Sequence, residues 1–283
     1  MTTILDVLEK GAAFLTGKGI PDARLNMELL VAQQLECQRM DLYLRFDTPL
    51  STPDLASLRE SLKKRAQGVP LQHLAGYVDF HRHRFHCDSR ALIPRPETEE
   101  LVELTLKQKF PRPARVLDLA CGSGCLGISI AKALGSDCHS LLLTDLQEGP
   151  LALTRENLTA LDQEAEVRQS DLFQELAGHF DLITANLPYV PEREKATLAP
   201  ELAYDPPAAL FGGPDGLEIV RRFCAAVPEH LAPGGLVAME VGHDQGSATA
   251  ALLQAADLTE IEIATDLSDQ PRFVFAWARP DIP

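Results

Sequence analysis

The chain has 283 residues, of which 45% are hydrophobic and 24% are charged, so it has the composition of a globular protein and not of a disordered or collagen-like one. Its 26 Lys and Arg residues stand against 41 Asp and Glu residues, which gives a formal net charge of −15 at pH 7. Residues 1–75 carry equal numbers of basic and acidic side chains, so the excess acid lies in residues 76–283. Because acidic surfaces repel phosphate backbones, we expect a protein or small-molecule partner and no nucleic acid.

Cysteine spacing and hydropathy exclude further classes of protein. None of the six cysteines forms the CxxC pair of a zinc ribbon or a thioredoxin-like site, so we expect reduced thiols and no bound metal. No window approaches the ~18 to 20 apolar residues of a membrane span, and the N-terminus lacks the pattern of a signal peptide. We therefore expect a cytoplasmic protein without membrane contact, and we take a monomer as its expected oligomeric state.

A helical pattern runs through the first part of the chain. Apolar residues recur every three or four positions from Ile4 to Leu15 and again from Leu25 to Leu35. A third amphipathic run ends in Lys63-Lys64-Arg65, which we expect to be an exposed helix end because cations are favourable at the negative end of the dipole. The pattern predicts a small helical domain over residues 1–75.

The pattern changes after that domain. Residues 76–91 are rich in aromatic and β-favouring side chains, which predicts a β-hairpin linker, and a helix with an acidic first turn is expected to begin at Pro96. From residue 114 onward, short apolar runs alternate with helix-length stretches. This alternation predicts an α/β domain over 92–283, with a mostly parallel sheet, helices on both faces and ligands at the carboxyl ends of the strands. The predicted strands are ARVLDLA (114–120), SLLLTD (140–145), AEVRQSD (165–171), FDLITAN (180–186), GLVAMEV (235–241), IEIATDL (261–267) and PRFVFAWA (271–278).

A glycine-rich loop follows the first of these strands. Gly122, Gly124 and Gly127 satisfy the pattern GxGxxG, in which glycines let the backbone turn tightly and approach a ligand. Asp145 ends the second strand, where a carboxylate can accept hydrogen bonds from both hydroxyls of a ribose. On its own this pattern fits NAD as well as S-adenosylmethionine.

Asp118, at the end of the first strand, distinguishes these two ligands. A carboxylate there could hold an ammonium group, whereas it would repel the pyrophosphate of a dinucleotide. The sequence therefore favours a ligand with a zwitterionic amino-acid tail.

The segment Asn186-Leu187-Pro188-Tyr189 follows another predicted strand. Pro188 forces Leu187 toward an extended conformation, so the Leu187 carbonyl is held outside any helix. With the side-chain carbonyl of Asn186 it forms a pair of acceptors suited to an NH2 group, and Tyr189 can stack on a flat group. This loop predicts a substrate with an amide or amino group.

These segments together resemble the release factor glutamine methyltransferase family, also called HemK or PrmC. The glycine loop is shared by many methyltransferases, whereas IPRPETE (93–99) joined to Asn-x-Pro-Tyr is much more specific. The resemblance implies a helical N-terminal domain, a hairpin linker and a Rossmann-like, seven-stranded class I methyltransferase domain. The matching segments are 92–127, Ser170-Asp171, 186–189, Asp205-Pro206 with Ala209-Leu210, 213–217, and Glu240-Val241-Gly242 with Gln245.

The family resemblance also implies an activity and a partner. It implies transfer of a methyl group from S-adenosylmethionine to N5 of the glutamine in the Gly-Gly-Gln motif of bacterial peptide chain release factors, leaving S-adenosylhomocysteine. Two positions depart from the family pattern, because Leu187 replaces the usual Pro and Asp205 replaces the common Glu. Since the backbone carbonyl of Leu187 is the group expected to bind the substrate NH2 group, we expect substrate binding to persist.

Residue roles are carried over by position. The resemblance implies that the loop from Ala120 to Gly124 lines the methionine part of the cofactor, that Asp145 binds the ribose and that Leu172 borders the adenine. The expected cofactor-binding residues are Asp118, Ala120, Cys121, Gly122, Ser123, Gly124, Asp145, Asp171, Leu172 and Asn186, and the expected catalytic and substrate-binding residues are Asn186, Leu187, Pro188 and Tyr189.

Three alternative activities stay open at this point. Asn-Leu-Pro-Tyr also resembles the motif of rRNA adenine dimethyltransferases, so an adenine N6 methyltransferase acting on RNA or DNA is one of them, although the net charge opposes it. Methylation of a glutamine in a ribosomal protein is a second alternative, and it is a close variant of the release factor activity. An NAD-dependent oxidoreductase is supported by the glycine loop and Asp145, but no evident hydride-transfer His or Tyr-Lys pair accompanies them.

The roles of a histidine cluster and of one arginine are also open. His81, His83 and His86 alternate along one short strand and give at most two ligands on a face, so we expect a solvated hairpin and no metal site. Arg95 either braces the linker or approaches the substrate cleft.

Overall fold

The computed structural model describes residues 1–174 and 176–280, and the chain divides into two compact units. One unit comprises Met1–Tyr77 with Ala199–Tyr204, and the other comprises Val78–Leu198 with the chain from Asp205 onward. Among the described residues, no helix has the length and apolar character needed to cross a bilayer.

The helical unit is built on helices that share an apolar core. The helices of this unit are α1 (Ile4–Gly17), α2 (Ala23–Gln34), η1 (Arg39–Leu44), α3 (Thr52–Ala66), α4 (Leu71–Ala75) and η4 (Pro200–Tyr204). Thr3 and Asp6 form a capping box at α1, in which each side chain accepts a hydrogen bond from the other residue's backbone N–H. Ile4, Leu8 and Leu15 on one face of α1 are buried with residues of α2 in a core of the unit's own.

The end of α3 differs from the expectation of an exposed basic cluster. Arg65 is 3% exposed, and its Nε donates to Asn26 Oδ1 at 2.5 Å. Its guanidinium also pairs with Glu201, while the Tyr204 hydroxyl donates to the Gln67 carbonyl at 3.0 Å. The prediction was wrong for Arg65 because a segment more than 130 residues later in the chain supplies the counter-charge.

The hairpin consists of β1 (Tyr77–Phe80) and β2 (His83–His86). His81 and Arg82 in its turn have φ values of 43° and 68°, a left-handed pair typical of tight hairpins. His86 is exposed, but the His81 side chain is only 10% exposed and its Nε2 lies 3.0 Å from Glu103 Oε1. The expected solvated cluster is therefore wrong for His81. Among the described residues, no three His, Cys, Asp or Glu side chains are grouped so as to hold a metal ion.

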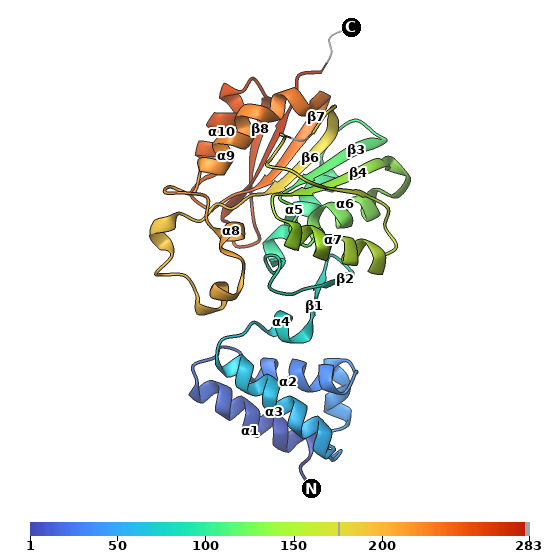
Figure 1. Cartoon of the computed structure of the whole chain (residues 1–283), viewed down its shortest axis with the longest axis vertical. Helices are drawn as coiled ribbons and strands as arrows, with labels where there is room; N and C mark the ends of the chain where they lie inside the picture. Colours follow the sequence, from blue (N-terminus) through green and yellow to red (C-terminus); the bar gives the residue numbers. More distant parts are fainter. Residues whose placement is uncertain (175, 281–283) are drawn as a thin grey trace. The chain divides into compact units, whose positions relative to one another are not determined.

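The second unit is built on a seven-stranded sheet, which confirms the predicted class I methyltransferase fold (Figure 1). Its strands are β3 (Ala114–Leu119), β4 (Cys138–Asp145), β5 (Glu166–Gln169), β6 (Phe180–Asn186), β7 (Leu231–Glu240), β8 (Thr259–Thr265) and β9 (Pro271–Trp277). The order is β5-β4-β3-β6-β7-β9-β8, with β3 to β7 pairing in parallel and β9 antiparallel to both of its neighbours.

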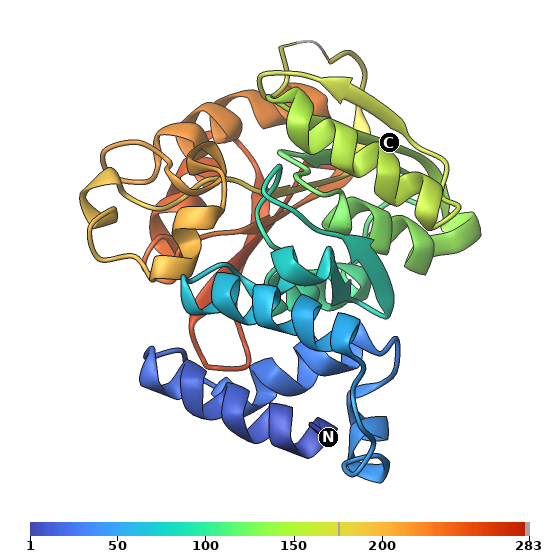
Figure 2. The same ribbon diagram turned by 60° about the horizontal axis from the view of Figure 1, so that its bottom comes forward.

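Helices cover both faces of this sheet (Figures 1 and 2). The helices of this unit are α5 (Pro96–Lys107), α6 (Cys125–Leu134), η2 (Gly135–Asp137), α7 (Glu148–Ala160), η3 (Glu192–Glu194), α8 (Pro207–Leu210), α9 (Glu218–Ala226), η5 (Val227–His230) and α10 (Gly246–Ala255). Because side chains alternate along a strand, Val116 joins a core with α5 and α6, while Leu117 joins one with α9 and α10. β3 lies between β4 and β6 where the strand order reverses, and open parallel sheets bind ligands at the carboxyl ends beside such a reversal.

Candidate functional site

A cavity of about 1150 Å³, including its open mouth, lies at the carboxyl ends of β3, β4 and β6. Asp118, Asp145 and Asn186 contribute to its wall, one from each of these strands. Most of the remaining wall comes from the loops that follow the three strands, together with residues 90–95 and α8. The sheet thus brings together carboxylates and an amide that are up to 68 residues apart in the sequence.

The β3–α6 loop shapes one side of the cavity. Ala120, Gly122 and Gly124 have φ values of 53°, 57° and 80°, so the loop turns sharply through left-handed conformations. A Cβ built at Gly124 would meet Ile128 Cδ1 at 2.9 Å, and one at Gly127 would meet Leu143 Cδ2 at 2.7 Å. The glycines therefore serve both the turn and the close packing of α6 on the sheet.

Asp118 lies beneath this loop. It is 1% exposed, its Oδ2 accepts from the Gly127 backbone N–H at 3.0 Å, and its Oδ1 accepts from the Thr184 hydroxyl at 2.8 Å. Burial raises the pKa of Asp118 to about 7, although both hydrogen bonds oppose the shift. Each oxygen is thus committed to a donor of the protein, and the carboxylate also contributes to the cavity wall.

Asp145 faces the cavity from the end of β4. Its Oδ2 accepts from the Gly122 N–H at 3.1 Å and its Oδ1 from the Gln147 N–H at 3.0 Å, which couples the carboxylate to the shape of the glycine loop. Burial raises the pKa of Asp145 while these backbone hydrogen bonds lower it. Oxygen lone pairs beyond those two bonds suit the vicinal hydroxyls of a ribose.

Other residues predicted to bind cofactor also line the cavity. Asp171 Oδ2 accepts from Arg222 at 2.8 Å, and Leu172 follows it with a φ of 52°. Ser123 is buried and its Oγ has no hydrogen-bond partner among the described residues. Burial raises the pKa of Cys121 well above its ordinary value, so this thiol is unsuited to act as a nucleophile.

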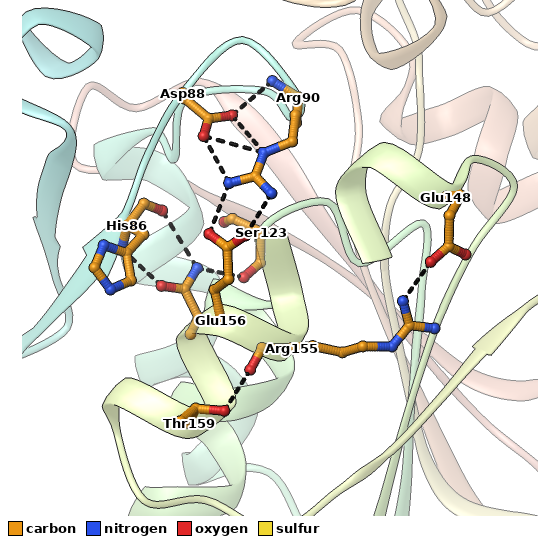
Figure 3. A network of polar contacts seen from close by, with 9 residues as sticks. His86, Asp88, Arg90, Ser123, Glu148, Arg155, Glu156 and Thr159 are labelled. Carbon is orange, nitrogen blue, oxygen red and sulfur yellow. Dashed lines mark hydrogen bonds and ion pairs between the residues drawn. The ribbon is translucent and has the colours of Figure 1, made fainter. Parts of the chain in front are cut away.

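A polar network holds the Ser123 side of the loop in place (Figure 3). Asn157 Nδ2 donates to the Ser123 carbonyl at 2.9 Å, and Asn157 Oδ1 accepts from the His86 N–H at 2.6 Å. Arg90, at the cavity rim, pairs with both Asp88 and Glu156. Sequence reasoning missed this support, because the contacts join the hairpin to α7.

The Asn-Leu-Pro-Tyr loop forms the opposite side of the cavity. Asn186, Leu187 and Pro188 belong to its wall, whereas Tyr189 does not. The Tyr189 hydroxyl instead donates to Glu240 Oε1 at 3.4 Å, and burial raises the pKa of Tyr189. The structure therefore brings three of the four predicted substrate residues together and turns the fourth toward β7.

Residues outside the predicted set support this loop. Gln245 Nε2 donates to the Tyr189 carbonyl at 2.9 Å. Cβ atoms at Gly212 and Gly216 would lie 2.3 Å from the Pro188 oxygen and 2.2 Å from the Tyr189 oxygen. The GGPDG segment (212–216) therefore needs glycine at these two positions because the backbone approaches the loop directly.

Arg95 takes both of the roles left open for it. Its Nη2 donates to Asp205 Oδ2 at 2.6 Å, and Asp205 Oδ1 accepts from the Ile93 N–H at 3.2 Å. The Asp205 carboxylate is fully buried, and Arg95 lines the cavity. The shorter Asp in place of Glu still reaches the arginine.

Comparison with known proteins gives matches along most of the chain. A family model described as the PrmC N-terminal domain matches residues 6–76, and one described as the methyltransferase small domain matches residues 98–213. The release factor glutamine methyltransferase of Deinococcus radiodurans is 35% identical over 96% of this chain and 97% of its own length. The protein of the same name from Geobacter sulfurreducens is 35% identical over 96% and 95%.

Solved structures resemble about two thirds of the chain or more at lower identity. A methyltransferase from Pyrococcus furiosus has a TM-score of 0.52 and 13% identity, covering 69% of this chain and 88% of that one. A 16S rRNA N2 G1207 methyltransferase from Thermus thermophilus, solved with AdoMet and guanosine, has a TM-score of 0.51 and 17% identity, covering 72% and 50%. At these identities the likeness shows the fold alone.

Proposed function

Since the chain belongs to the release factor glutamine methyltransferase family, we propose that it transfers a methyl group from S-adenosylmethionine to the side-chain amide nitrogen of the glutamine in the Gly-Gly-Gln motif of bacterial peptide chain release factors. One observation supports the proposal above the others. A single cavity is lined by Asp145, whose carboxylate suits a ribose, and by Asn186 and Leu187, whose side-chain and backbone carbonyls form a pair of acceptors suited to an NH2 group.

The cavity wall fits S-adenosylmethionine. Ser123 Oγ is a buried polar atom that lacks a partner among the described residues, and the Asp145 carboxylate lines the cavity where a ribose would bind. Leu146, which is 57% exposed, and Leu172 give that side of the cavity an apolar surface for an adenine ring. The cofactor supplies a methyl group on a positively charged sulfur. The acidic residues around it, Asp118 and Asp145, favour a cationic ligand over an anionic one.

The residues of the substrate loop act by positioning. An amide nitrogen is a poor nucleophile because its lone pair is delocalised into the carbonyl. Two acceptors, Asn186 Oδ1 and the Leu187 carbonyl, can each take one N–H of the glutamine and hold the NH2 group in line for attack. They also stabilise positive charge as it develops on the nitrogen. The proton can leave after transfer, so no strong base is required in the cavity.

The experiment that tests the proposal is a competition between substrates. The protein is incubated with methyl-labelled S-adenosylmethionine and either a purified release factor or bare RNA, at low and moderate salt. We expect label in the release factor at both salt concentrations, because binding that depends on phosphate contacts would fall steeply with salt. Label in RNA adenine, with none in the release factor, would overturn the proposal.

A further inference from the structure

The segment Pro96-Glu97-Thr98-Glu99 contributes a hydroxyl to the substrate side of the cavity. Thr98 lies in the first turn of α5 and is 3% exposed. Its Oγ1 donates to Glu240 Oε2 at 2.6 Å and accepts from Asn186 Nδ2 at 3.2 Å. Thr98 therefore stands between a carboxylate at the end of β7 and the amide expected to bind substrate.

The direction of these bonds follows from counting protons. A threonine hydroxyl has one proton, and here it lies on the short bond to Glu240. The hydroxyl oxygen can then only accept, so Asn186 must present its NH2 group to Thr98. The opposite orientation would place Asn186 Oδ1 against an oxygen that has no proton left to donate, and two facing acceptors are unfavourable. With Nδ2 held in this way, Asn186 Oδ1 is left for the cavity, which Asn186 lines.

Glu240 connects Thr98 and Tyr189 in this hydrogen-bond network. It is 2% exposed and does not line the cavity. Its Oε2 accepts a hydrogen bond from the Thr98 hydroxyl and its Oε1 accepts one from the Tyr189 hydroxyl, so Glu240 orients Asn186 through Thr98 and Tyr189 directly. Burial raises the pKa of Glu240, while the hydrogen bond from Thr98 and the positive charge of Arg272 oppose this shift.

We propose that Thr98 and Glu240 are positioning residues that fix the Asn186 amide with Oδ1 toward the substrate, so that the site accepts an NH2 donor and rejects a carboxylate. This inference rests on the proposed function, since it concerns the same loop. This role explains why α5 and β7 each place a buried polar side chain, Thr98 and Glu240, next to the Asn-Leu-Pro-Tyr loop. A glutamate side chain, which has only acceptors at pH 7, would face two further acceptors in the same site.

The test compares three conservative variants on one helix. Thr98→Val removes the hydroxyl and keeps the shape, whereas Thr98→Ser keeps the hydroxyl. Thr105→Val is the matched control, because Thr105 is also buried on α5 but its Oγ1 has no partner among the described residues. Single-turnover methylation of a release factor at saturating S-adenosylmethionine, cofactor affinity by calorimetry and the melting temperature are measured for each.

We expect Thr98→Val to slow transfer by about tenfold or more, with cofactor affinity within about twofold of wild type, because a flipped amide costs at least one hydrogen bond in the transition state. Thr98→Ser and Thr105→Val should transfer at nearly the wild-type rate. A Thr98→Val protein that is folded and as fast as Thr98→Ser would overturn the inference. If wild type itself fails to methylate the release factor, it is the proposed function that has failed.

A double mutant separates positioning through Asn186 from a general structural effect. If Thr98 acts only through Asn186, Thr98→Val combined with Asn186→Ala should be no slower than Asn186→Ala alone. Rate losses that multiply in the double mutant would show that Thr98 acts independently, and the inference would be wrong.

Discussion

The two sides of the cavity are built by different means. The glycine loop on the cofactor side takes its shape from backbone conformation, with positive φ at Ala120, Gly122 and Gly124 within five consecutive residues. The Asn-Leu-Pro-Tyr loop on the substrate side is held by side chains that come from α5 and from the end of β7 and the turn after it. The cofactor side therefore combines a locally encoded backbone turn with support from Asn157 and Asp145, whereas the substrate side depends on side chains that the assembled sheet brings to it.

Because of this difference, we expect substitutions to change cofactor affinity and the rate of methyl transfer independently. Changes on the glycine side should alter cofactor affinity, because they act on groups expected to touch the ribose and the methionine. Changes on the Asn186 side should mainly alter the rate of transfer and should change cofactor affinity less. The following expectations run from the largest effect to the smallest.

Asn186→Ala should give the largest effect on transfer. The substitution removes one of the two acceptors for the glutamine NH2 group, and loss of a single preorganised hydrogen-bonding group slows other enzymes roughly 100-fold or more. The measurement is the single-turnover rate on a release factor at saturating cofactor. Asn186→Asp is the companion variant. It keeps an acceptor but adds a negative charge beside the sulfonium, so it should bind cofactor and transfer poorly.

Asp145→Ala should weaken cofactor binding by roughly 1 to 3 kcal/mol, the cost of losing charge-assisted hydrogen bonds. In the structure this carboxylate also accepts a hydrogen bond from the Gly122 N–H, so part of the lost cofactor affinity should come from a change in the glycine loop. Calorimetry with S-adenosylmethionine measures the change. Asp145→Asn keeps one acceptor and should fall between Ala and wild type. Unchanged affinity in a folded Asp145→Ala protein would show that the carboxylate is not the ribose ligand.

Asp118→Asn should reveal the energetic cost of the buried carboxyl group. Burial raises the pKa of Asp118 to about 7 from an ordinary value of 3.8, so between these pH values the folded state holds a proton that the unfolded state has lost. Folding stability therefore falls as the pH rises through this window. An asparagine can still accept from Gly127 and donate to Thr184. The melting temperature of Asp118→Asn, measured relative to that of wild type, should rise by a few degrees between pH 5 and pH 8. A melting-temperature difference that does not change with pH would contradict the raised pKa of Asp118.

Leu187→Pro should have the smallest effect on transfer. The substitution keeps the backbone carbonyl, and the extended conformation that Pro188 imposes on residue 187 suits proline. The Leu187 side chain is 1% exposed within the core beneath α9, so the variant should lose about 1 kcal/mol of stability through reduced packing. Turnover and thermal unfolding are measured together. An inactive but folded variant would show that the side chain of residue 187 matters to substrate binding.

The fold and part of the cavity wall could be predicted from the sequence, because local patterns of residues encode them. Alternating apolar runs predicted the strands that the structure shows, and Asp145 and Asn186 could be selected because each ends such a run beside a turn signal. Thr98 and Glu240 lay inside recognised motifs, yet their contact joins residues 142 positions apart and no local pattern shows it. Arg65 and Tyr189 were placed differently for the same reason, since Glu201 and Glu240 are their distant partners.

Cofactor affinity and single-turnover rate measured together on Asp145→Ala and Asn186→Ala test the division of the cavity most directly. The account predicts a crossed result, in which Asp145→Ala binds S-adenosylmethionine weakly but transfers at nearly the wild-type rate once saturated, while Asn186→Ala loses less affinity for the cofactor and transfers slowly. An Asn186→Ala protein that transfers at nearly the wild-type rate, or two variants that lose affinity and rate in parallel, would contradict it.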